Sequence, residues 1–212
     1  MRLCRENGAL ILDSHICLRS GRHGSAFFDG RAVMATPALL EAASMRIIGL
    51  DVFGQAEVIV GRGNATVELA TLVAQRHLDF MPSRLMIRSQ PRRKQGERVV
   101  VSFEPFHAAK LRGQRVVFVE DVATTSTTCE GVIRGIRRCG GEVTGGIVIL
   151  NRGEITAEQL GIPEFESVIP LAEIGGEEQW QSWTSDKCPL CAAGQPLEWV
   201  VDDQRGFLVP TK

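Results

Sequence analysis

A short segment near the middle of the chain combines acidic and hydroxyl side chains in a pattern suited to binding a phosphorylated sugar. The apolar run Val116–Val119 leads directly into Glu120 and Asp121. Carboxylates accept hydrogen bonds from sugar hydroxyls, while hydroxyl and backbone N–H groups at a helix N-terminus bind phosphate. We therefore predict a sugar-phosphate site formed by the two acids and the segment after them, which contains Ala123, Thr124, Thr125, Ser126, Thr127 and Thr128.

A simpler interpretation is that this segment only starts a helix. Ser126, Thr127 and Thr128 would then cap the helix N-terminus, and the two carboxylates would be solvated. A cap uses one hydroxyl and leaves the other four hydroxyl side chains of the segment unexplained. The pattern favours the binding site, and the sequence leaves both interpretations open.

The elements that position this segment follow from the hydrophobic pattern. Runs of β-branched residues bounded by glycine or charge indicate strands, and apolar residues at helical spacing indicate helices. Strands are expected at 58–60, 85–87, 99–101, 116–119, 146–150 and 168–169, and helices at 37–50, 67–77 and 127–139. Their alternation predicts an α/β fold with a mainly parallel sheet of five or six strands and helices on both faces. Ligands bind beyond the carboxyl ends of such strands, where the acidic segment is expected.

Composition and charge describe an ordinary globular chain. The 212 residues include 24 Lys and Arg and 25 Asp and Glu, a net charge of −1, which does not favour nucleic acid or an anionic membrane as a partner. No apolar run approaches the roughly 20 residues of a membrane helix. Because Asp13, Ser14 and His15 interrupt the apolar residues after the N-terminus, no signal peptide is complete. We expect a cytoplasmic protein.

Three regions are expected along the chain. The strand–helix alternation occupies residues 36–174 and predicts the core domain. The first residues, 1–35, are expected to form an N-terminal hood, and residues 175–212 a C-terminal appendage.

The six cysteines are scattered, which at this chain length favours buried or metal-bound thiols over disulfides. Only Cys188 and Cys191 have zinc-knuckle spacing, and a structural zinc needs four ligands. One interpretation is a zinc completed by Cys4, Cys17, His107 or a second subunit. The other is a plain turn with packed thiols, and we predict this one, with no metal.

Several segments resemble one enzyme family. Residues 117–128, VFVEDVATTSTT, resemble the phosphoribosyl-pyrophosphate motif of type I phosphoribosyltransferases. Residues 18–22 and 26–29 are similar to the N-terminal signature of orotate phosphoribosyltransferases. Residues 148–152 resemble that family's strand ending in a substrate-binding arginine, and residues 188–194 resemble the tail of one bacterial and archaeal branch. The matches occur in the same order and cover most of the chain.

The resemblance implies Mg²⁺-dependent transfer of a phosphoribosyl group from phosphoribosyl pyrophosphate to a pyrimidine base, with orotate as the first choice. By similarity, Glu120 and Asp121 bind the ribose hydroxyls, Asp121 contributes to catalysis, and Ala123 to Thr128 bind the 5′-phosphate. Arg152 would pair with the orotate carboxylate, a task suited to a planar bidentate donor. Its alternative role is that of a charge at a strand end in solvent.

The resemblance also implies base contacts from Arg19, Phe27 and Phe28, with plain core packing as the alternative for the two phenylalanines. The basic stretch from residue 88 to residue 98 would be a mobile loop that covers the pyrophosphate of a neighbouring subunit, which implies a homodimer. In that loop Arg88 would bind phosphoribosyl pyrophosphate. The negative charge that develops on the departing pyrophosphate in the transition state would be neutralised by Arg92, Arg93 and Lys94. A solvated loop is the alternative.

The chain departs from the family pattern in three places. Ser126 and Thr127 stand where glycines are usual, Arg93 and Gln95 stand in place of a Lys-x-His pair, and residues 66–67 lack a glycine. These departures leave two alternatives open. One is a non-catalytic sensor of phosphoribosyl pyrophosphate or a nucleotide, and the other is a phosphoribosyltransferase that uses a different base.

Overall fold

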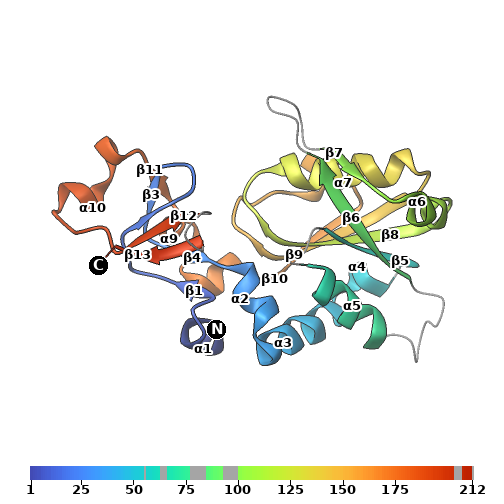
Figure 1. Cartoon of the computed structure of the whole chain (residues 1–212), viewed down its shortest axis with the longest axis horizontal. Helices are drawn as coiled ribbons and strands as arrows, with labels where there is room; N and C mark the ends of the chain where they lie inside the picture. The colour runs from blue at the N-terminus through green and yellow to red at the C-terminus, as the bar shows by residue number, and fades with distance from the viewer. Residues whose placement is uncertain (55, 63–65, 77–84, 93–99, 203–206, 212) are drawn as a thin grey trace. The chain divides into compact units, whose positions relative to one another are not determined.

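The computed structural model describes residues 1–54, 56–62, 66–76, 85–92, 100–202 and 207–211. They form two compact units, both drawn in Figure 1. Unit 1 consists of Met1–Asp29 together with Leu171–Lys212, and unit 2 consists of Gly30–Pro170. None of the described helices is long and apolar enough to cross a membrane.

Unit 2 is built on a six-stranded sheet. In spatial order its strands are β10 (Glu164–Ile169), β9 (Glu142–Asn151), β8 (Arg115–Ala123), β5 (Val58–Arg62), β6 (Leu85–Arg92) and β7 (Val100–Ser102). Every neighbouring pair is parallel except β6 and β7, which are antiparallel. The predicted α/β class and mainly parallel sheet are confirmed.

Helices cover both faces of this sheet, as the apolar strands require. The helices of unit 2 are α2 (Gly30–Ala35), α3 (Pro37–Ile48), α4 (Asp51–Gly54), α5 (Val67–Arg76), α6 (Pro105–Leu111), α7 (Ser126–Arg138) and α8 (Ala157–Leu160). Along β8, Val116 and Phe118 belong to the buried cluster formed with α7, so Val117 and Val119 face the opposite side. In Figure 1, α7 lies on one side of the sheet and α4 and α5 on the other.

The strand that leads into the acidic segment is longer than predicted. Apolar residues end at Val119, yet β8 continues to Ala123 because its backbone stays paired with β9 as far as Ala123 opposite Asn151. Glu120 and Asp121 are therefore strand residues rather than loop residues. Their side chains alternate between the two faces of the sheet.

Unit 1 joins the two ends of the chain in a second sheet. Its spatial order is β11 (Ser182–Trp183), β3 (His23–Gly24), β2 (Ile16–Cys17), β12 (Trp199–Asp202) and β13 (Phe207–Pro210). A separate antiparallel pair joins β1 (Leu10–Ile11) to β4 (Phe27–Phe28). The short helices are α1 (Arg2–Glu6), α9 (Gly176–Gln179) and α10 (Pro189–Ala192), with 3₁₀ turns η1 (Leu171–Ile174) and η2 (Ser185–Lys187).

The sequence predicted the hood and the appendage as separate regions, whereas the structure interleaves their strands. Strand β2 pairs in parallel with β12, so residue 16 lies opposite residue 199. Most of these strands have only two residues, too few to show an alternating pattern. The buried apolar cluster within this sheet is small, with Ile16, Phe27 and Val201 at its centre.

Candidate functional site

The carboxyl edge of the parallel sheet in unit 2 brings together the polar residues predicted to bind ligand. Strand β5 ends at Arg62, β8 ends with the acidic pair and Ala123, and β9 ends at Asn151, followed by Arg152. The register places Ala123 opposite Asn151, so the loop into α7 starts beside the turn that carries Arg152. This edge is the expected ligand position of a parallel sheet.

The hydroxyl segment turns three threonine side chains to solvent rather than using them as caps, while the Ser126 hydroxyl donates to Oε1 of Glu130 at 2.6 Å. Helix α7 begins at Ser126, and the residue at its N-cap, Thr125, makes no hydrogen bond with its side chain to the helix. Thr124, Thr125 and Thr127 are exposed. The interpretation that hydroxyls merely cap the helix is therefore wrong. Exposed hydroxyls and a helix N-terminus without a side-chain cap form a suitable cradle for a phosphate group.

The backbone of this segment does not need the glycines that are usual in the family. Ser126 and Thr127 lie in the first turn of α7 and have right-handed helical geometry. Among the described non-glycine residues, only Asp13 and Glu154 have a positive φ. The two substitutions for glycine therefore leave the loop unstrained.

Two glycines allow the close packing that positions the site, and neither lies in a motif that sequence analysis could single out. The N–H of Gly153 donates to the carbonyl oxygen of Ala123 at 2.9 Å. A Cβ on Gly153 would lie 2.4 Å from the carbonyl oxygen of Thr124, and a Cβ on Gly30 would lie 2.6 Å from Cβ of Asp121. A Cβ atom does not make non-bonded contacts this short, so a larger residue at either position would force its neighbour to move.

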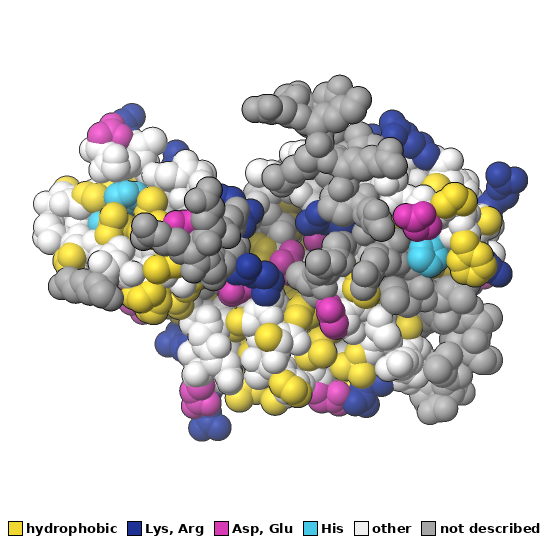
Figure 2. All heavy atoms as spheres, viewed as in Figure 1, with side chains coloured by type: hydrophobic (Ala, Val, Ile, Leu, Met, Phe, Trp, Pro, Cys, Tyr) yellow, Lys and Arg dark blue, Asp and Glu magenta, His cyan; other side chains and the backbone are white. Residues whose placement is uncertain are grey.

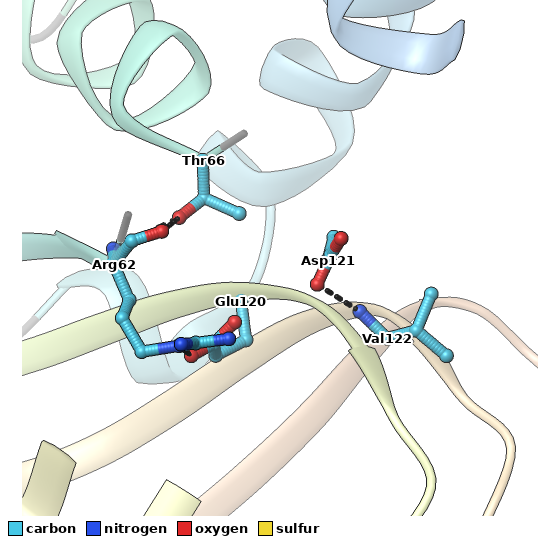
Figure 3. A network of polar contacts seen from close by, with 5 residues as sticks. All are labelled: Arg62, Thr66, Glu120, Asp121 and Val122. Carbon is cyan, nitrogen blue, oxygen red and sulfur yellow. Dashed lines mark hydrogen bonds and ion pairs between the residues drawn. The ribbon is translucent and has the colours of Figure 1, made fainter. Parts of the chain in front are cut away.

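Glu120 lies buried against Arg62, a residue that sequence reasoning missed. Glu120 is 2% exposed, and Nε of Arg62 donates to its Oε1 (Figure 3). Thr66 holds the backbone of Arg62, because its hydroxyl accepts from the Arg62 N–H and donates to the Arg62 carbonyl, each at 2.9 Å. The only signal in the sequence was the position of Arg62 at the carboxyl end of a predicted strand.

Burial raises the pKa of Glu120 to about 7, against the opposing effect of the Arg62 guanidinium. A raised pKa means that the folded chain holds a proton on this carboxyl group at pH values where the unfolded chain has released it. The stability that this group contributes is therefore fully present below its ordinary pKa of 4.5 and is lost as the pH rises to about 7.

The variant Glu120→Gln tests this pH dependence, because it removes the titrating group. Between about pH 5 and pH 8 we expect the free energy of unfolding of the wild type to fall by about 2 kcal/mol more than that of the variant. Urea unfolding of both proteins at the two pH values measures the difference. Parallel pH profiles would show that Glu120 does not titrate in this range.

Asp121 occupies a different environment from Glu120. Figure 3 shows the two side chains pointing away from each other, as neighbours on a strand do. Asp121 is half-buried, and its Oδ1 accepts a hydrogen bond from the N–H of Val122 at 2.8 Å. The buried acid is thus paired within the protein, and the more accessible acid is Asp121.

Arg152 stands on a turn that is fixed by the side chain of Asn151. Nδ2 of Asn151 donates to the Ile155 carbonyl at 2.8 Å, and the Ile155 N–H donates to Oδ1 of Asn151 at 3.0 Å. Arg152 itself is half-buried, and burial lowers the pKa of its guanidinium, which remains charged at neutral pH. A half-buried cation on a fixed turn differs from the solvent-exposed strand end considered as its alternative.

The other predicted binding residues lie in unit 1 or in the basic stretch. Arg19 is exposed in the β2–β3 turn. Phe27 and Phe28 are 8% and 7% exposed, and Phe27 packs in the apolar cluster of unit 1, the core packing given above as their alternative role. The expectation that the basic stretch is a loop from residue 88 onward is wrong for residues 88–92, because Arg88 and Arg92 belong to strand β6, which pairs with β7. The side chains of these two residues are not described, and Arg93 and Lys94 lie outside the described residues.

Comparison with known proteins identifies relatives of this chain. No family model matches it. It is 28% identical over 199 residues to an orotate phosphoribosyltransferase of Caldanaerobacter subterraneus subsp. tengcongensis, covering 91% of this chain and 90% of the relative. It is also 28% identical over 203 residues to an orotate phosphoribosyltransferase of Thermus thermophilus, covering 94% of this chain and 98% of the relative.

Solved structures show the same fold. The crystal structure of orotate phosphoribosyltransferase from Aeropyrum pernix aligns with a TM-score of 0.61 at 23% identity, covering 82% of this chain and 97% of that one. An orotate phosphoribosyltransferase from Mycobacterium tuberculosis aligns with a TM-score of 0.61 at 21% identity, with the same coverage. The chain thus has the type I phosphoribosyltransferase fold and orotate phosphoribosyltransferases among its homologues.

Proposed function

We propose that this chain, a homologue of the orotate phosphoribosyltransferases, transfers the phosphoribosyl group of phosphoribosyl pyrophosphate to orotate, giving the nucleoside monophosphate and pyrophosphate. One observation carries the proposal. The exposed hydroxyl loop at the start of α7 lies at the same sheet edge as Asp121 and the turn that carries Arg152. This edge offers partners for a phosphate, a ribose diol and a carboxylate together.

Each group has a distinct task in the reaction. The loop from Thr124 to Thr128 binds the 5′-phosphate, Asp121 accepts hydrogen bonds from the ribose hydroxyls, and Arg152 pairs with the orotate carboxylate. A ring nitrogen of orotate forms the new bond to the anomeric carbon and loses its proton to solvent, and the bond to pyrophosphate breaks with its electron pair leaving on the pyrophosphate. The protein holds the two reactants in line and stabilises the positive charge that develops on the ribose.

The donor chemistry at this edge fits Mg²⁺, which prefers carboxylate and phosphate oxygens. Asp121 is a half-buried carboxylate with one oxygen hydrogen-bonded to the backbone, an arrangement that orients the group. Asp121 would hold the ion when phosphoribosyl pyrophosphate is bound. When bound, Mg²⁺ supplies positive charge that stabilises the departing pyrophosphate.

The remaining assignments belong to the same proposal. The basic stretch, with Arg88, Arg92, Arg93 and Lys94, covers the pyrophosphate of a neighbouring subunit in a homodimer. A cytoplasmic location is part of the same proposal.

Arg152→Ala tests the choice of base. The wild type should use orotate at least roughly 100-fold better, in kcat/KM, than uracil, which lacks the carboxylate. The variant should raise KM for orotate about tenfold, the scale of a charged hydrogen bond, and leave KM for phosphoribosyl pyrophosphate unchanged.

Arg115→Ala is the matched control. Arg115 begins β8 at the opposite edge of the sheet and forms an exposed pair with Glu57, so its loss should change neither KM. Steady-state kinetics with orotate, uracil and adenine measure these effects. A higher kcat/KM for uracil or adenine than for orotate would assign the enzyme to a different base.

A further inference from the structure

Unit 1 contains a cluster of four metal-binding side chains that the proposed function does not use. His15 and His23 from the N-terminal segment meet Cys188 and Cys191 from the C-terminal segment, and one ligand atom from each lies within 4.8 Å of all the others. His15, His23 and Cys188 are 1%, 7% and 2% exposed, and Cys191 is exposed. Figure 2 shows histidine atoms beside side chains of the hydrophobic class, which includes cysteine, near α10.

The spacing of these atoms is close to that of the ligands around one tetrahedral ion. Nε2 of His15 lies 3.6 Å from Sγ of Cys188 and 3.6 Å from Sγ of Cys191. Nδ1 of His23 lies 3.2 Å from Sγ of Cys191 and 2.9 Å from Nε2 of His15. Around a tetrahedral zinc, with bonds of about 2.0 Å to nitrogen and 2.3 Å to sulfur, a nitrogen and a sulfur lie about 3.5 Å apart and two nitrogens about 3.3 Å apart.

Local structure holds each pair of ligands in place. His15 and His23 flank the tight β2–β3 turn, in which the N–H of Leu18 donates to the Arg22 carbonyl at 2.7 Å. Cys188 is the N-cap of α10, and the N–H of Ala192 donates to its carbonyl at 3.0 Å. The helical turn between the cysteines keeps both thiols on one side.

A backbone contact fixes the orientation of the His15 ring. Its Nδ1 lies 2.8 Å from the carbonyl oxygen of Gln195, which can only accept, so Nδ1 carries the proton and donates it. The lone pair is then on Nε2, which faces the other three ligands. Metal-binding histidines are commonly oriented by this kind of second hydrogen bond.

We propose that His15, His23, Cys188 and Cys191 bind one structural zinc ion that joins the two chain segments of unit 1. Two thiolates and two imidazoles form a donor set that suits zinc, and four protein ligands leave no open position for catalysis. Sequence reasoning weighed Cys4, Cys17 and His107 as partners for the cysteine pair. In the proposed site the cysteine pair is completed instead by the two histidines, His15 next to β2 and His23 on β3.

The proposed ion has a clear structural task. Unit 1 is made of residues 1–29 and 171–212, which are joined only through the whole of unit 2, and among its described residues the cluster around Ile16, Phe27 and Val201 is small. Bringing such distant segments together costs loop-closure entropy that a small core offsets poorly. A zinc bound to both segments adds its binding free energy to the folding of unit 1.

Metal analysis of the purified full-length chain tests the proposal. The protein is unfolded with a chelator and refolded with or without Zn²⁺, and its metal is counted by mass spectrometry. We expect about one zinc per chain in the wild type. Replacement by Co²⁺ should give the visible absorption of tetrahedral cobalt together with a thiolate charge-transfer band.

Variants of His23 distinguish a role as a metal ligand from a role as a hydrogen-bonded side chain. His23→Asn retains hydrogen-bonding capacity and should lose the zinc, whereas His23→Cys supplies another ligand and should retain it. Cys17→Ser is the control, because Cys17 lies on β2 outside the cluster and should keep full zinc content. Zinc retained by His23→Asn, a Cys188–Cys191 disulfide, or a wild type that binds no zinc would each overturn the proposal.

Tryptophan fluorescence gives a readout that is independent of activity. The three tryptophans of the chain, Trp180, Trp183 and Trp199, all belong to unit 1. Removing zinc from the wild type should shift their emission to longer wavelength as unit 1 loosens, and adding Zn²⁺ should reverse the shift. Identical emission and melting temperature with and without zinc would contradict the structural role.

Discussion

Asp121→Asn is expected to lower kcat/KM for phosphoribosyl transfer by about 100-fold while the fold survives. Asparagine has nearly the same size and can still accept the hydrogen bond from the N–H of Val122, so the strand end should remain in place. The substitution removes the negative charge that, in our proposal, accepts hydrogen bonds from the ribose hydroxyls and binds Mg²⁺. Loss of one preorganised electrostatic contact has this magnitude.

The matched control for this variant is Asp51→Asn. Asp51 is exposed in the first turn of α4, which precedes the amino end of β5, and it should affect neither rate nor affinity. Steady-state kinetics and thermal unfolding of both variants measure the effects. Full activity in Asp121→Asn would show that this acid is only a solvated strand residue, and its unfolding free energy would then change by no more than about 0.5 kcal/mol.

Gly153→Ala is expected to weaken the binding of phosphoribosyl pyrophosphate and to lower kcat/KM by about 100-fold. The new Cβ would lie 2.4 Å from the carbonyl oxygen of Thr124 and 2.8 Å from its carbonyl carbon, so the backbone of the phosphate loop must move. A displacement of about 1 Å in a positioning element costs a factor of this size. Gly153 has no positive φ, so alanine introduces the contact without backbone strain.

Gly54→Ala is the control for adding a methyl group at a glycine. Gly54 ends α4, has no positive φ, and has nothing within 4 Å of an added Cβ. Calorimetric titration with phosphoribosyl pyrophosphate and Mg²⁺ should give wild-type affinity for Gly54→Ala and weaker affinity for Gly153→Ala. If circular dichroism shows that both variants are folded and their affinities are equal, the α7 loop does not take part in ligand binding.

The sequence was most informative where elements are long and their periodicity is strong. The predicted strand 116–119 and helix 127–139 correspond to β8 and α7, and the acidic segment lies between their apolar parts as expected. Four buried α7 residues of one apolar face, Cys129, Val132, Ile133 and Ile136, pack on one sheet face, so their spacing alone located the helix.

The rest depends on contacts between residues far apart in the chain. Nothing near Glu120 in the sequence indicates that Arg62 reaches it from another strand, or that Gly30 must be small because Asp121 packs against it. The two-residue strands of unit 1 carry no periodic signal, so the approach of His15 and His23 to the cysteine pair was not visible. Tertiary pairing of distant segments decides these features.

The most direct test of the central claim is the stoichiometry of the reaction catalysed by the purified wild type. Orotate consumption is followed by absorbance, pyrophosphate release by a coupled assay, and the product by mass spectrometry, with phosphoribosyl pyrophosphate and Mg²⁺ supplied. We expect orotate loss, pyrophosphate release and nucleoside monophosphate formation in equal amounts, all abolished when Mg²⁺ is removed. Calorimetric binding of phosphoribosyl pyrophosphate without turnover of orotate or any other base would contradict the claim and identify the chain as a sensor.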